Sequence, residues 1–114
     1  MTEEIQLLAL LIFGHMLADY PLQGDFLSKA KNRLSPIPGV PWYQALAAHS
    51  VIHAGFVGII TGNLFIAIGE FMAHCLIDDA KCSGKLSFNQ DQALHIACKA
   101  LWVVLAVWAL KGSI

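Results

Sequence analysis

Charged side chains are scarce in this sequence. Only 13% of its 114 residues are Asp, Glu, Lys or Arg and 57% are hydrophobic, whereas a soluble domain averages about 25% charged residues. A soluble fold of this size has a large surface relative to its core and needs polar residues to cover it. The composition therefore argues against an ordinary soluble domain. The formal net charge of −1 leaves no basic surface, so we expect no nucleic-acid partner.

Two further features are missing. The three cysteines, Cys75, Cys82 and Cys98, are odd in number and lack C-x-x-C spacing, so we expect small packing residues and no disulfide framework. The first apolar block follows Thr2-Glu3-Glu4 and not a positively charged segment, and no A-x-A site comes after it. A cleavable signal peptide is therefore not expected.

The apolar residues instead form four long blocks. They predict helices over about 3–19, 42–61, 64–80 and 91–110 in a single domain, 1–114. Each block approaches the roughly 20 residues that a membrane-spanning helix needs. The predicted fold is an all-α integral membrane protein, a four-helix up-down-up-down bundle. In the linker 20–41, Phe26, Leu27, Ala30 and Leu34 share one helical face, which is typical of a short interfacial helix.

Basic residues indicate the orientation of this bundle. The two longer loops hold five of the seven, namely Lys29, Lys31, Arg33, Lys81 and Lys85, and the terminal side has only Lys111. The positive-inside rule then predicts cytoplasmic loops and both termini outside.

A short internal similarity suggests duplication. His15 to Asp19 and His74 to Asp78 both read H-x-L-x-D. Two pseudo-repeated helical hairpins would produce this pattern.

Histidines and aspartates occur in pairs four residues apart, so each pair shares one helical face. The pairs are His15 with Asp19, His49 with His53, His74 with Asp78, and Asp91 with His95. In an up-down-up-down bundle all eight converge near the cytoplasmic side.

Imidazole and carboxylate groups bind zinc, iron or manganese, so we predict one or two divalent ions, with zinc as the first candidate. A metal-free polar or proton-relay network is the alternative. His53 is the weakest candidate ligand, because it lies one turn deeper than its neighbours. Glu70, one turn deeper than His74, is either a group that supports a metal ligand or a protonated core carboxyl, and we favour the protonated carboxyl.

Such a centre suggests a metal-dependent hydrolase acting on a lipid or amphiphile from the cytoplasmic side. A metal ion makes water acidic enough to attack near neutral pH. An aspartate that does not bind the metal, Asp19 or Asp91, would serve as general base. Lys81 or Gln23 would stabilise developing negative charge.

Four motifs together carry a family resemblance. They are His15-x-x-x-Asp19-Tyr20-x-x-Gln23, His49, His74-x-x-x-Asp78-x-x-Lys81, and Asp91-Gln92-x-x-His95. The chain resembles a family of small bacterial and phage membrane proteins catalogued as domain of unknown function 3307. The resemblance implies a protein of the bacterial inner membrane, or of the host membrane if phage-encoded, and implies no particular activity.

Two other functions fit the same residues. A transport module would pass protons or metal ions through the polar groups, and because four helices make a thin pore it would require a homo-oligomer. A small membrane interaction protein would hold a structural metal with no open coordination position.

Overall fold

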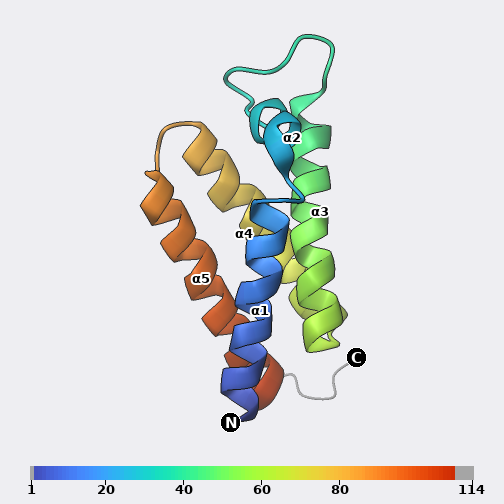
Figure 1. Ribbon diagram of the computed structural model, residues 1–114, viewed down its shortest axis with the longest axis vertical. Coiled ribbons are helices and arrows are strands. Elements are labelled where there is room, and N and C mark those ends of the chain that lie inside the picture. The colour runs from blue at the N-terminus through green and yellow to red at the C-terminus, as the bar shows by residue number, and fades with distance from the viewer. Residues whose placement is uncertain (1, 110–114) are drawn as a thin grey trace.

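The computed structural model describes residues 2–109, and this part of the chain is helical without strands (Figure 1). Its elements are α1 (Glu3–Asp19), α2 (Gly24–Ala30), α3 (Trp42–Thr61), α4 (Leu64–Cys82), α5 (Phe88–Val104) and a π-helical turn, Leu105–Ala109, that continues α5. The all-α prediction is confirmed. The expected last residue of the fourth helix, 110, and Lys111 lie outside the described residues.

Side-chain caps fix where the helices start. The Thr2 hydroxyl accepts a hydrogen bond from the Ile5 N–H at 3.2 Å, and the Asn63 side chain accepts one from the Ile66 N–H at 3.1 Å. Each satisfies a backbone donor that the first helical turn leaves free. Helix α3 ends at Gly62, whose φ of +66° is left-handed and favours glycine. The Gly62–Asn63 pair therefore joins α3 to α4 in a tight turn.

Helix α5 starts three residues earlier than the sequence prediction. The Ser87 hydroxyl accepts from the Gln90 N–H at 3.1 Å, and the Gln90 side-chain oxygen accepts from the Ser87 N–H at 2.9 Å. Because of this capping box, residues 88–90 are helical, although we had assigned them to a loop. Helix α4 likewise continues to Cys82, beyond the expected residue 80.

Four helices lie alongside one another (Figure 1). Helix α3 packs against α1 and α4, and α5 packs against the same two helices. Helix α2 bends away from α1 by 83°. In Figure 1, α2 and the α4–α5 turn lie at the upper end, and the N-terminal end of α1 lies at the lower end with the α3–α4 turn.

Two helices are long and apolar enough to cross a membrane, Trp42–Thr61 and Phe88–Ala109, and α1 with α2 would make a third if they form one broken span. Helix α4 has 19 residues but carries four charged side chains, Glu70, Asp78, Asp79 and Lys81. Large apolar side chains point outward, including Ile59, 84% exposed, and Leu76, 73% exposed. The chain is therefore a helical protein with two or three candidate spans, and the four-span bundle stays a prediction.

The interior has an apolar layer and a polar layer. Leu11, Val57, Ile66 and Trp102 belong to one buried apolar cluster. Beyond this cluster, in the direction of α2, each of the four long helices carries ionisable side chains at intervals of about one helical turn. The polar side chains therefore share one level of the structure.

Candidate metal centre

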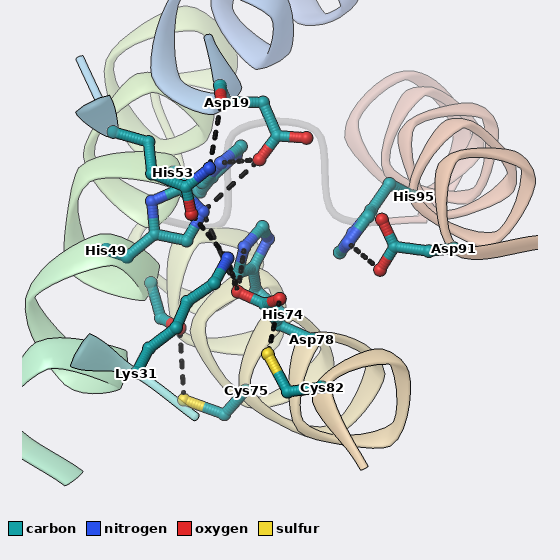
Figure 2. Close-up of polar contacts among 12 residues, drawn as sticks. Asp19, Lys31, His49, His53, His74, Cys75, Asp78, Cys82, Asp91 and His95 are labelled. Atoms are coloured by element: carbon teal, nitrogen blue, oxygen red, sulfur yellow. Dashed lines mark hydrogen bonds and ion pairs between the residues drawn. The ribbon is translucent and has the colours of Figure 1, made fainter. Parts of the chain in front are cut away.

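Four helices contribute to the polar layer. Helix α1 gives His15 and Asp19, α3 gives His49 and His53, α4 gives Glu70, His74 and Asp78, and α5 gives Asp91, His95 and Lys99. All five histidines are at most 2% exposed. The side chain of Asp19 is 12% exposed. The predicted convergence of the paired residues is thus seen in the structure (Figure 2).

Asp19 lies at the centre of this layer. One carboxylate oxygen, Oδ1, is 3.2 Å from His49 Nε2 and 3.2 Å from His53 Nε2 (Figure 2). The other, Oδ2, accepts a 2.7 Å hydrogen bond from the Gln92 amide. Two imidazole nitrogens from α3 are therefore directed at one oxygen from α1, and His53 is not too deep to take part.

The imidazole rings are packed together. His53 stacks on His74 with ring centroids 3.8 Å apart, and His74 stacks on His95 at 4.4 Å. His49 meets His74 nearly edge-on at 4.9 Å. His74 therefore contacts histidines of both α3 and α5.

Two groups of side chains have the spacing of a metal site. Ligand atoms of Asp19, His49, His53 and His74 lie within 4.8 Å of one another, and so do ligand atoms of Glu70, His74 and His95. The first group combines three imidazoles and a carboxylate, a set of donors that suits zinc, iron or manganese. Both groups need His74.

A lysine from the linker reaches into this layer. The Lys31 ammonium is 3% exposed and donates to Asp78 Oδ2 at 2.7 Å and to the Gln23 side-chain oxygen. Asp78 Oδ2 is 3.7 Å from both His49 Nε2 and His74 Nε2. Lys31 thus neutralises Asp78, although the sequence analysis had counted this lysine only among the basic residues of the loops.

A second buried lysine neutralises Glu70. Lys99 Nζ donates to Glu70 Oε1 at 2.7 Å, and the Trp102 indole donates to the same oxygen at 2.8 Å. Glu70 and Lys99 are each 1% exposed. The interpretation of Glu70 as a protonated core carboxyl is therefore wrong, because it is an ion-paired carboxylate.

Three other predicted site residues lie beside the two groups. His15 Nε2 is 3.0 Å from the Gln92 side-chain oxygen and 3.6 Å from Asp19 Oδ2. Asp91 Oδ1 is 3.2 Å from His95 Nε2, and these two lie across from the α3 histidines in Figure 2. The Gln23 amide donates to the Asp19 backbone carbonyl at 3.1 Å. Asp19 is therefore contacted by His15 from its own helix, α1, and by Gln23 from the turn that follows.

Lys81 does not join the polar layer. Its ammonium lies 5.3 Å from the centre of the Phe88 ring, at the turn between α4 and α5. The lysines that do join it, Lys31 and Lys99, were not among the predicted site residues. Lys99 had a detectable signal, since it follows Asp91 and His95 at the same four-residue spacing.

The comparisons with known proteins identify the family. Neither the curated proteins nor the solved structures include a match to the chain. The model of one protein family matches residues 7–113, a range that includes every residue of the polar layer. The chain therefore belongs to the family described as protein of unknown function DUF3307.

Proposed function

We propose that the chain is a membrane hydrolase that depends on one divalent metal ion. Asp19, His49, His53 and His74 would bind this ion. The observation that carries the proposal is the clustering of four ligand atoms within 4.8 Å, on side chains that are buried or nearly so. Zinc is the first candidate because it prefers imidazole with one carboxylate or water, and iron and manganese are the alternatives.

The charge of the polar layer supports a divalent ion. Its carboxylates are Asp19, Glu70, Asp78 and Asp91, and its ammonium groups are Lys31 and Lys99. With neutral imidazoles these groups carry two more negative than positive charges. An uncompensated charge is costly in a low-dielectric interior. One divalent cation would bring the net charge of the polar layer to zero and remove this cost.

One ion fits this layer better than two. The second group of candidate ligands shares His74 with the first, and a neutral imidazole has one free lone pair to donate. Its carboxylate, Glu70, is already paired with the Lys99 ammonium at 2.7 Å. A second ion would have to displace that lysine.

The surrounding residues support hydrolysis. A bound metal ion supplies a water nucleophile near neutral pH. Asp19 is one of the four proposed ligands, so the general base that would accept the proton of that water is Asp91, whose Oδ1 is 3.2 Å from His95 Nε2. The water oxygen would bond to the acyl or phosphoryl centre, the bond to the leaving group would break, and the leaving group would take the proton from Asp91. Lys31 takes the charge-stabilising role that we had predicted for Lys81.

The membrane setting suggests the substrate. In the proposed arrangement the four long helices alternate in direction across the bilayer, with the α2 linker and the α4–α5 turn in the cytoplasm, as the basic residues of these loops predict. Phe26 and Leu34 of the linker are 58% and 61% exposed, as expected of a segment that lies in the membrane interface. A lipid or another amphiphile of the cytoplasmic leaflet would enter there.

Metal content tests the proposal. Elemental mass spectrometry of chelator-free, detergent-purified protein should find about one zinc, iron or manganese per chain. His53→Gln should lose the metal. Asp79→Asn is the matched control, because Asp79 pairs with Arg33 at 2.8 Å and belongs to neither group of candidate ligands. Hydrolysis of lipid esters, amides and phosphoesters would then be assayed with the loaded protein. Absence of metal from the wild type would refute the mechanism.

Proton or metal-ion transport is the second candidate. The observation in its favour is that all five histidines lie inside the structure, each at most 2% exposed. Flux into proteoliposomes without turnover of any lipid would support transport in place of hydrolysis.

A further inference from the structure

We infer that Glu70 is a positioning residue, which holds the His74 imidazole in the one tautomer that can bind a metal ion. The inference rests on the proposed function, in which His74 is a ligand. It assigns a separate role to Glu70, Lys99 and Trp102. These three residues would set the proton position on His74 without touching the ion.

The Glu70 carboxylate contacts the Nδ1 side of the His74 ring. Glu70 Oε2 is 3.3 Å from His74 Nδ1, and the two residues are one helical turn apart on α4. An ionised carboxylate only accepts hydrogen bonds. His74 therefore carries its proton on Nδ1, and the lone pair of a neutral ring lies on Nε2.

Two donors fix the orientation of Glu70 itself. Lys99 Nζ at 2.7 Å and Trp102 Nε1 at 2.8 Å both donate to Oε1. Oε2 is thereby the oxygen that faces His74. Since Glu70 and Lys99 are each 1% exposed, water does not compete for these bonds.

The opposite nitrogen of His74 is left for a ligand. His74 Nε2 is buried and has no hydrogen-bond partner among the described residues. Asp78 Oδ2 is 3.7 Å from Nε2, an ion-pair distance only for a protonated ring, and it accepts its hydrogen bond from Lys31 at 2.7 Å. A carboxylate on one ring nitrogen and an open lone pair on the other is the arrangement found around metal-binding histidines.

The isosteric variant Glu70→Gln reverses this arrangement. Lys99 and Trp102 both donate, so they select the amide oxygen and turn the amide NH₂ toward His74. That group donates to Nδ1 and drives the ring proton to Nε2, where it blocks the metal. We expect metal affinity to fall about 10- to 100-fold, the usual effect of losing such a partner.

The tautomer is read directly from ¹⁵N spectra of histidine-labelled protein without metal, with His74 assigned by a His74→Gln variant. In the wild type Nδ1 should be protonated and Nε2 unprotonated, and in Glu70→Gln the two should be reversed; a ring protonated on both nitrogens would overturn the inference. Asp79→Asn is the matched control on the same helix, since Asp79 pairs with Arg33 at 2.8 Å, and it should change neither the tautomer nor the metal affinity.

The outcomes separate the two proposals. An unprotonated Nδ1 in the wild type, or no change in Glu70→Gln, overturns the positioning role even if the protein binds metal. If neither the wild-type protein nor any variant binds metal, the proposed function is refuted. The tautomer of His74 then still decides whether Glu70 positions this ring.

Discussion

The ion pair between Lys99 and Glu70 should dominate the stability of the polar layer. The two groups are 2.7 Å apart and each is 1% exposed. The variant Lys99→Met keeps most of the side-chain volume but leaves the Glu70 carboxylate buried without its cation. Breaking such a pair typically costs about 3–5 kcal/mol, which lowers the folding equilibrium constant by roughly 10² to 10⁴ (about 1.4 kcal/mol per factor of ten).

The double variant Lys99→Met with Glu70→Gln removes the stranded charge. Because replacing both members of a buried pair is often nearly neutral, most of the lost stability should return. The matched control is Lys29→Met. Lys29 pairs with Asp25 at 3.0 Å, but the two side chains are 68% and 83% exposed, so this change should cost at most about 0.5 kcal/mol.

Denaturant titration in mild detergent would measure all four proteins, with helix content followed by circular dichroism. The reasoning predicts a large loss for Lys99→Met, a clear recovery in the double variant and almost no loss for Lys29→Met. If Lys99→Met were no worse than Lys29→Met, the buried pair would not exist as described. If the double variant were as unstable as Lys99→Met, the cost would come from packing and not from charge.

Two other predictions concern the linker and the packing of Trp102. Arg33 donates to Asp79 at 2.8 Å and to Ser83 at 3.1 Å, so Arg33→Gln should loosen the linker and raise the rate of trypsin cleavage after Lys29 a few-fold; an unchanged rate would mean that other contacts hold the segment. A Cβ at Gly69 would lie 3.1 Å from Trp102 Cη2, so Gly69→Val should cost about 1–3 kcal/mol by overpacking and shift indole fluorescence, whereas unchanged unfolding and emission would contradict this close approach.

Periodicity was enough to predict which histidines and aspartates come together. A spacing of four residues places each pair on one face of its helix, and the tight Gly62–Asn63 turn makes α3 and α4 neighbours. Because each pair lies toward the end of its helix that is nearest α2, the four pairs lie at the same height in the structure. This argument needs no knowledge of how each helix is rotated, because the only polar face of a largely apolar helix has to point inward.

The partners of the lysines could not be predicted in this way. Lys81 follows Asp78 by three residues, so it is about 300° further around the helix, and its long side chain extends toward Phe88. Lys31 comes from a linker whose path depends on the 83° bend after α1. Neither the bend nor the direction of a flexible side chain is encoded in a short sequence pattern.

The positions of the carboxylates within their helices set Asp19 apart from the others. Asp91 lies in the first turn of α5, where the helix dipole favours negative charge. Asp78 lies near the end of α4, where the dipole disfavours it, and Lys31 compensates at 2.7 Å. Asp19 is the last residue of α1, and within residues 2–109 no lysine or arginine forms an ion pair with it. Its contacts come from histidines and Gln92. Protons on those histidines or a metal ion among them would compensate the charge of Asp19, and the metal content of the purified protein distinguishes the two.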